Sequence, residues 1–555
     1  MGRKQITGRD AFMQLLVQEG VTHVFGNPGT TELALMEVVP NYPQIKYVLG
    51  LQESIVLGMA DGFGRATGQL SAVNLHCTPG LGHAMGALYT AKFSGSPILV
   101  TAGQYEIGYG LTEPLLYEPL VRIAEPLVKW SVEVERAEDL PRIVHRAAKI
   151  ALSPPSGPVF ISLPGSVLDE VTETELGHPS RVESNVQPTP AILHRLAQRI
   201  LSSRSPAILA GQELARHDCF DLAGDFATAI GAAVYQESVA YNSRFPTSHP
   251  ANMGEITRNQ HKARELLSRH DLLLCLGADL LRMSPKASVE PLPEGLPVIH
   301  ISERDWELGK NYPTEMAVRA NVASTLEALL SVIRKLQTRN DIDQAQTRLE
   351  TLQAMNWTNR RNNLANTLAA SDSKSPIDAD LAIYHVVQAL TPETIVVDEN
   401  PTYANTLFKL LPAELPDRYF GLTSGGLGFA MAGAIGISLG KPGRPVVATI
   451  GDGSSLYSIQ SLWTAAHLKL PITYVIFNNR SYQIIKDRLL AMRKTDRFIG
   501  MDLSEPYIDF ISVANGFGIN AMRITDASQI GPAIATAIAS GKPSLVDIAI
   551  EPSLS

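Results

Sequence analysis

The chain has 555 residues, with 47 basic and 55 acidic side chains and a formal net charge of −8. A chain of this length is expected to form about three domains, and its acidic balance gives no positive field to hold nucleic acid or an anionic membrane. No uninterrupted run of about 18 apolar residues occurs, which disfavours a membrane span. Three dispersed cysteines are too few for a disulfide framework, so we expect a reducing, cytoplasmic setting.

Short apolar runs alternate with longer helical patterns along the whole chain, which predicts an α/β protein with parallel sheets covered by helices on both faces. A first domain is expected over residues 1–180, with strands ending near residues 26, 49, 75, 100 and 161. The polar, proline-containing stretch 177–190 predicts a linker. A middle domain is expected over 190–340, followed by one long polar helix ending near Arg360, with strands at 207–209, 272–274 and 298–300.

A second polar passage at 370–376 precedes another series of alternating strands and helices. We expect a third domain over 375–555, with strands at 394–397, 445–448, 473–476 and 545–547. The predicted fold class is therefore α/β, with three doubly wound domains built on mainly parallel sheets.

The most specific motif is Gly451-Asp452-Gly453-Ser454, followed at the end of the next predicted strand by Asn478-Asn479. The glycines allow a tight turn and close approach of the backbone to a phosphate, and a helix expected to begin near Tyr457 would direct amides toward an anion. The Asp452 carboxylate and the Asn479 carbonyl can share one Mg²⁺ that also binds a diphosphate. Neighbouring parallel strands end here, where open α/β sheets bind ligands.

This arrangement resembles the diphosphate-binding motif of thiamine diphosphate enzymes. The resemblance implies that Glu53, which follows a first-domain strand, holds N1′ of the cofactor's aminopyrimidine. More of the chain is similar to the benzoylformate decarboxylases of the 2-oxoacid decarboxylase and acetolactate synthase superfamily. The stretches that carry this similarity are 24–29 with Glu32, 74–76, 84–88, 126–131 and 425–430.

The resemblance implies roles for several further residues. Gly425 would accept from the cofactor's 4′-amino group, Leu427 would impose its bent conformation, and His76 would move protons on and off the substrate. Thr30 stands where the family has a serine that orients the substrate carboxylate. His83 has no such match and receives no role. The Ser481 carbonyl would complete the metal shell, and the diphosphate would contact Thr402, Gly453, Ser454, Tyr457 and Tyr482.

Two positions depart from the family pattern. Ser284 stands where the family has its second catalytic histidine, and a serine at neutral pH cannot replace an imidazole as acid or base. Arg488 stands near the family's aromatic wall, where a guanidinium would favour a polar or anionic substrate tail. The alternative places Arg488, and more strongly Lys486, on a solvated helix face. An apolar pocket wall is expected from Leu115, Leu116 and Ile485.

These features predict a non-oxidative decarboxylase that uses thiamine diphosphate and Mg²⁺ to convert a small 2-oxoacid to CO₂ and an aldehyde. The alternative is a carboligase resembling acetolactate synthase, or a lyase of 2-hydroxyacyl thioesters. An FAD-bearing oxidase is disfavoured because no GxGxxG motif follows a strand in the middle domain. A non-enzymatic homologue is disfavoured because Glu53, Asp452 and Asn479 all remain. The family implies sites shared between subunits of a homo-oligomer, expected to be a dimer of dimers.

Overall fold

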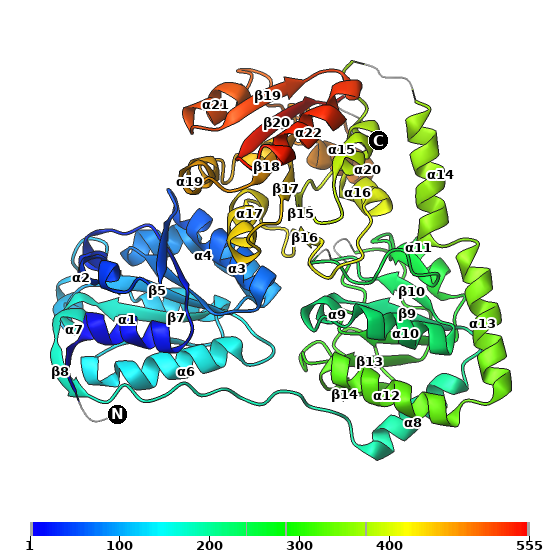
Figure 1. Cartoon of the computed structure of the whole chain (residues 1–555), viewed down its shortest axis with the longest axis horizontal. Helices are drawn as coiled ribbons and strands as arrows, with labels where there is room; N and C mark the ends of the chain where they lie inside the picture. The colour runs from blue at the N-terminus through cyan, green and yellow to red at the C-terminus, as the bar shows by residue number, and fades with distance from the viewer. Residues whose placement is uncertain (1–3, 240, 284–285, 372–374, 552–555) are drawn as a thin grey trace.

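The computed structural model describes residues 4–239, 241–283, 286–371 and 375–551. Within them the chain forms three six-stranded sheets and one two-stranded sheet. All strand pairs of the six-stranded sheets are parallel, so the predicted α/β class is confirmed. Figure 1 shows the three sheets in three separate parts of the molecule, coloured blue to cyan, green, and yellow to red. No helix of the described residues is both long and apolar enough to cross a membrane.

The first sheet has the strand order β3-β2-β4-β5-β7-β6. Every strand predicted for this part of the chain is present, whereas the short β1, β6 and β8 are not predicted; β1 pairs antiparallel with β8. Its strands are β2 (His23–Gly26), β3 (Lys46–Leu49), β4 (Ser71–Leu75), β5 (Ile98–Gln104), β6 (Ser131–Glu133) and β7 (Val159–Pro164), and the separate two-stranded sheet consists of β1 (Lys4–Thr7) and β8 (Val171–Thr174). Its helices are α1 (Gly8–Gln18), α2 (Leu33–Val38), α3 (Glu53–Thr67), α4 (Cys77–Ser94), α5 (Leu120–Ala124), α6 (Leu140–Leu152) and α7 (Gly165–Asp169).

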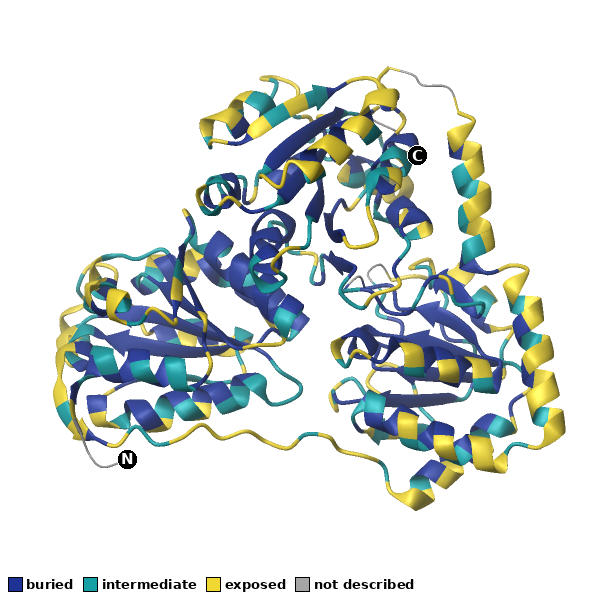
Figure 2. Cartoon of the chain, in the orientation of Figure 1, coloured by how far each residue is buried: buried dark blue, intermediate teal, exposed yellow. Residues whose placement is uncertain are grey.

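Residues 175–189 contain no helix or strand and run along the outside of the molecule to the second sheet (Figures 1 and 2). That sheet has the order β11-β10-β9-β12-β13-β14. Its strands are β9 (Pro206–Ala210), β10 (Ala233–Gln236), β11 (Asn252–Glu255), β12 (Leu272–Leu276), β13 (Val298–Ser302) and β14 (Met316–Arg319). Its helices are α8 (Pro190–Leu201), α9 (Gln212–Arg216), α10 (Phe220–Ile230) and α11 (Gln260–Leu267).

The prediction of one long polar helix ending near Arg360 is wrong. The segment forms three helices, α12 (Val322–Leu336), α13 (Arg339–Gln353) and α14 (Trp357–Ala369). Thr338 and Asp341 form a capping box that starts α13, and the Asn356 side chain accepts a hydrogen bond from the Asn359 amide to start α14. Each cap satisfies free backbone N–H groups and so begins a new helix.

The third sheet has the order β16-β15-β17-β18-β20-β19 and includes all four predicted strands. Gly451 lies opposite Phe477 in the pairing of β17 with β18, so Asp452 and Asn479 leave the sheet at the same edge. Its strands are β15 (Ile395–Glu399), β16 (Tyr419–Gly421), β17 (Val446–Gly451), β18 (Ile472–Asn478), β19 (Asn520–Ile524) and β20 (Ser544–Ala549). Its helices are α15 (Ala379–Ala389), α16 (Ala404–Leu410), α17 (Phe429–Gly440), α18 (Asp452–Ser455), α19 (Ser461–Leu468), α20 (Gln483–Arg493), α21 (Phe510–Gly516) and α22 (Ile530–Ala539).

Helices α3 and α17 join the first and third parts of the molecule through a shared hydrophobic core. Glycines bring their backbones into contact: a Cβ on Gly62 would lie 2.2 Å from the Gly433 carbonyl oxygen, and one on Gly436 would lie 1.9 Å from that of Met59. No larger residue fits at either position without moving a helix. Figure 2 shows this junction as buried.

Candidate active site

A cavity of about 110 Å³ lies at the carboxyl ends of β17 and β18, where open parallel sheets bind ligands. All of its lining residues fall between 400 and 485. They include most of the cofactor, metal and pocket residues predicted in the third domain: Thr402, Leu427, Asp452, Gly453, Ser454, Tyr457, Asn479, Ser481, Tyr482 and Ile485. The fold therefore brings these residues together, although their roles remain predictions.

Asp452 and Asn479 direct oxygen atoms toward the same point. The backbone N–H of Ser481 donates to Asp452 Oδ2 at 3.3 Å and to Asn479 Oδ1 at 3.0 Å, and the Gly453 N–H donates to Asp452 Oδ1 at 2.8 Å. Asp452 is buried, and burial raises the pKa of its carboxyl to about 6. No basic side chain of the described residues forms an ion pair with it.

A magnesium diphosphate fits this donor set. A buried carboxylate with no cationic partner is costly, and a divalent cation would supply the missing charge. Mg²⁺ commonly binds through one or two protein oxygens and substrate phosphates. No cluster of three or more His, Cys, Asp or Glu suited to a metal occurs in the described part of the chain. A cation here would therefore rely on Asp452, Asn479 and the diphosphate it carries.

The predicted helix start near Tyr457 is wrong. A short helix, α18, already begins at Asp452, while the longer α19 begins only at Ser461. Asp452 is thus itself the first helical residue after β17, because the chain turns directly from the strand end. Gly453 is required there, since a Cβ on it would lie 2.5 Å from the Tyr482 ring.

The Gly425–Gly428 turn presents Leu427 to the cavity and precedes α17. Gly425 and Gly428 have φ values of +81° and +104°, a region that favours glycine. The buried Glu399 fixes this turn by accepting from the Gly428 N–H at 2.6 Å and the Ala430 N–H at 2.7 Å. Burial raises the pKa of the Glu399 carboxyl to about 7. Sequence patterns gave no signal for this positioning role.

Glu53 is the first residue of α3 and lies in the first domain, outside the cavity. Asn27 Nδ2 donates to its Oε1 at 3.3 Å, and His83 Nδ1 lies 3.1 Å from its Oε2. His83 therefore has a partner in the site, which the sequence reasoning missed. Its imidazole is 62% exposed, against 12% for the Glu53 side chain. Asn27 lies in the matched stretch 24–29, which could have drawn attention to it.

His76 follows β4 and is oriented by a buried carboxylate. Its Nδ1 lies 3.0 Å from Glu32 Oε2 and 3.0 Å from Thr31 Oγ1. The Glu32 side chain is 1% exposed and also accepts from the Gly29 and Gly103 N–H groups, at 2.8 and 3.0 Å. A hydrogen on Nδ1 would be donated to Glu32. Nε2, which has no partner among the described residues, would then be the ring atom that can accept and release a proton.

The remaining predicted residues lie outside the cavity. Thr30 is exposed in the turn before α2, and it is Thr31, not Thr30, whose hydroxyl contacts His76. Leu115 and Leu116 are 82% and 36% exposed. Arg488 is exposed on α20. Ser284 lies outside the described residues.

The expectation of a solvated Lys486 is wrong. Its side chain is buried, forms an ion pair with Asp502 and lies 5.3 Å from the centre of the Phe498 ring. The segment that follows α20 covers this face of the helix, which the local sequence pattern of α20 cannot reveal.

Three six-stranded parallel sheets, with a cavity at the strand ends of the third, define the class of protein. Family models describing thiamine pyrophosphate enzymes match this chain: the N-terminal TPP binding domain at residues 6–114, the central domain at 193–329 and the C-terminal TPP binding domain at 392–548.

The chain is 31% identical to the benzoylformate decarboxylase of Pseudomonas aeruginosa over 98% of both chains. It is 24% identical to an acetolactate synthase of Bacillus subtilis, over 98% of this chain and 93% of that one. The solved 4-hydroxybenzoylformate decarboxylase of Rhodococcus jostii superposes with a TM-score of 0.87 at 29% identity, over 99% of this chain and 100% of that one. The chain belongs to the thiamine diphosphate-dependent enzyme family that includes benzoylformate decarboxylase.

Proposed function

We propose that the chain is a non-oxidative, thiamine diphosphate- and Mg²⁺-dependent carboxy-lyase that converts a 2-oxoacid to CO₂ and an aldehyde. The observation that carries this proposal is the convergence of Asp452, Asn479, Leu427 and the glycine turns on one cavity, in a chain that matches a decarboxylase over its whole length. When bound, thiamine diphosphate would supply a nucleophilic carbon for the 2-oxo carbonyl and an electron sink for the electron pair that remains when CO₂ leaves.

The protein residues would bind, orient and move protons. Asp452, Asn479 and the Ser481 carbonyl hold the cation, while Ser454 and the Gly453 backbone lie beside the diphosphate. Glu53, held by Asn27, carries a proton at the pyrimidine N1′ position. His76 Nε2 gives or takes a proton at the substrate, with Nδ1 fixed by Glu32. Leu427 and Ile485 supply apolar surface that excludes water.

The active unit is proposed to be at least a dimer, assembled as a dimer of dimers. Two features support this: the third-domain cavity contains no first-domain residue, and the loop after β5 exposes apolar side chains, with Leu111 at 93% and Leu115 at 82%. Exposed apolar patches of this kind mark interaction surfaces. Glu53→Ala mixed with Asp452→Ala should regain part of the activity when sites are shared, whereas a fully active monomer in sedimentation would contradict sharing.

The proposed partners are a small 2-oxoacid or aldehyde, without nucleic acid or membrane, because the net charge of −8 offers no basic field. A reducing, cytoplasmic setting is supported by three cysteines that are all buried and free.

A second candidate function is carboligation, resembling acetolactate synthase, or cleavage of a 2-hydroxyacyl thioester. The similarity to acetolactate synthase over nearly the whole chain favours keeping it. Ser284, which departs from the benzoylformate decarboxylase pattern, also favours it.

The deciding experiment measures CO₂ release from a panel of aryl, aliphatic and dicarboxylic 2-oxoacids, with and without an acceptor aldehyde. Apoprotein stripped with a chelator should regain activity only with thiamine diphosphate and Mg²⁺ together. Aldehyde as the main product supports decarboxylation, and a hydroxyketone as the main product supports carboligation. Full turnover by cofactor-stripped protein would refute the proposal.

A further inference from the structure

A second and larger cavity, of about 610 Å³, lies where the three domains meet. None of the residues proposed to hold the cofactor, metal or substrate lines it. The first domain contributes the ends of α3 and α4, the middle domain contributes α9, and the third domain contributes the segments around β16 and after α17. Cavities of this size accommodate organic ligands.

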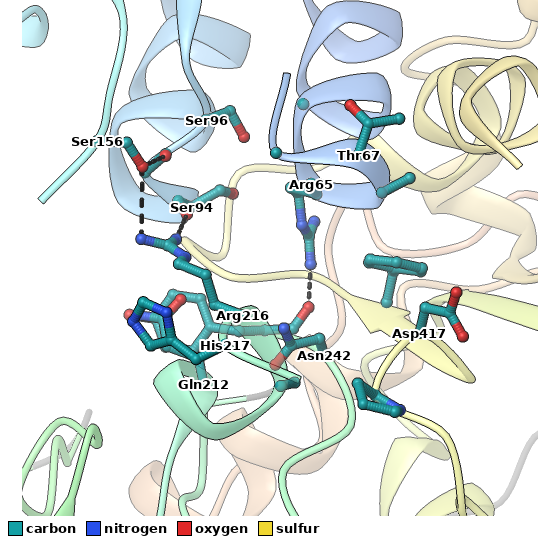
Figure 3. Close-up of a pocket in the computed structure, with 18 of the residues that line it drawn as sticks. Arg65, Thr67, Ser94, Ser96, Ser156, Gln212, Arg216, His217, Asn242 and Asp417 are labelled. Atoms are coloured by element: carbon teal, nitrogen blue, oxygen red, sulfur yellow. Dashed lines mark hydrogen bonds between the residues drawn. The ribbon is translucent and has the colours of Figure 1, made fainter. Parts of the chain in front are cut away.

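Arg216, in α9, extends into this cavity (Figure 3). Its Nη2 donates to the Ser94 carbonyl at 2.7 Å and its Nη1 to Ser156 Oγ at 3.5 Å. No carboxylate of the described residues forms an ion pair with it. The Arg216 side chain is exposed, because it faces the cavity rather than packed protein.

Arg65, at the end of α3, lines the same cavity from another domain (Figure 3). Its Nη2 donates to the carbonyls of Tyr241 and Gly421, while its Nη1 is buried without a hydrogen-bond partner. Its nearest acidic influence, Asp61, is bound by Ser94 and Ser96, and burial raises the pKa of that carboxyl.

Two of the three carboxylates that line the cavity, Asp417 and Glu303, have other partners. Asp417 pairs with Lys441 at 2.8 Å and Arg444 at 2.7 Å. Glu303 pairs with His217 at 3.0 Å. Asp218, which follows His217 in sequence, also lines the cavity, and its side chain is exposed. The wall thus presents two guanidinium groups without contacting counter-charges, together with hydroxyl and amide groups from Thr67, Ser96, Gln212 and Asn242.

We propose that this cavity binds an organic oxyanion, a phosphate ester or a polycarboxylate, with Arg216 and Arg65 as its cationic anchors. Guanidinium groups match the geometry of phosphate and carboxylate oxygens, and two of them face this cavity from two domains without a carboxylate in contact. Because the walls come from three domains, the bound anion links them. It therefore stabilises the folded arrangement of the holoenzyme.

The test uses the holoenzyme saturated with thiamine diphosphate and Mg²⁺, so that the diphosphate site is already filled. ADP, citrate and inorganic phosphate are each titrated to about 10 mM at constant ionic strength and Mg²⁺ activity, following the unfolding midpoint and the heat of binding. We expect a saturable rise of the midpoint. A response to ADP but not citrate identifies a phosphate ester, and the reverse identifies a polycarboxylate.

The variant Arg216→Gln should weaken binding at least about tenfold. Its matched control is Arg264→Gln. Arg264 also lies in the middle domain and also donates to a backbone carbonyl, in its case those of Glu290 and Leu292, but it lies outside the cavity. General stabilisation by salts would not saturate and would be equal in parent and variant. An equal response in parent and Arg216→Gln, or no saturable binding of any of the three anions by the parent, would overturn the proposal without affecting the proposed decarboxylation.

Discussion

Replacing Glu32 by glutamine tests whether the carboxylate behind His76 sets the protonation of the imidazole. Glu32 accepts from Gly29 N at 2.8 Å, Gly103 N at 3.0 Å and Thr31 Oγ1 at 2.6 Å, and it contacts His76 Nδ1 at 3.0 Å. An amide has one acceptor oxygen, so either orientation of glutamine leaves at least one backbone N–H facing an NH₂ group. An unpaired buried donor costs about 1–3 kcal/mol of unfolding free energy.

The same substitution replaces the carboxylate oxygen that contacts His76 Nδ1 and orients the imidazole. General acid–base catalysis contributes about 100- to 10,000-fold to rates, so we expect kcat to fall by up to about 100-fold and by less than in His76→Ala. Thiamine diphosphate binding, followed by near-ultraviolet circular dichroism, should be unchanged because Glu32 lies outside the third-domain cavity.

Glu19→Gln is the matched control for this prediction. Glu19 is also buried in the first domain and also contacts a histidine, His145, but not at the site. It should lose stability while retaining kcat. A Glu32→Gln enzyme with the parent's kcat and pH profile would refute the reasoning, and so would an equal loss of kcat in both variants.

Three further outcomes are expected. The pKa of Glu399 is raised from 4.5 to about 7, so between these pH values the folded chain keeps the proton while the unfolded chain ionises. The free energy of unfolding should therefore fall by up to about 3 kcal/mol as pH rises from 4.5 to 7, and then level off. Denaturant unfolding of Glu399→Gln should show a flatter profile, and an unchanged slope would contradict this assignment. His83→Ala should change kcat less than about tenfold, because the exposed imidazole contributes little to the Glu53 pair; loss of activity equal to that of Glu53→Ala would show a larger role. Arg488→Phe and Ser284→His should each raise kcat/KM for benzoylformate and lower it for 2-oxoacids with polar tails. If the unsubstituted enzyme already prefers benzoylformate and Arg488→Phe leaves kcat/KM unchanged, Arg488 lies away from the substrate.

The sequence predicted every strand that lies inside a six-stranded sheet except β10, but of the edge strands it predicted only β3. Strands such as β4 and β17 are buried along nearly their whole length and therefore form continuous apolar runs. The edge strands β14 and β19 alternate intermediate and exposed residues, and β6 has only three residues. Their patterns cannot be distinguished from loops without knowing which strand they pair with.

Site residues placed by the ends of adjacent strands could be predicted, whereas contacts made by long-range packing could not. Asp452 and Asn479 could be predicted because each directly follows a strand, and adjacent parallel strands bring their ends together. The contact of His76 with Glu32 spans 44 positions and depends on the packing of a turn against a strand end, which no local pattern encodes. Burial of Lys486 likewise depends on Asp502, sixteen residues away.

The glycine contacts between α3 and α17 have a mechanical consequence. Glu53 is the first residue of α3, and α17 begins at Phe429, two residues after Leu427, so a residue proposed to touch the cofactor lies at or just before the start of each helix. Because the two backbones touch at Gly62 and Gly436, the helices cannot slide or tilt past each other without a collision. The first and third domains therefore move as one rigid unit, and the distance between Glu53 and Leu427 within one chain is fixed. The middle domain takes no part in these glycine contacts and is connected to the first domain by the extended segment 175–189.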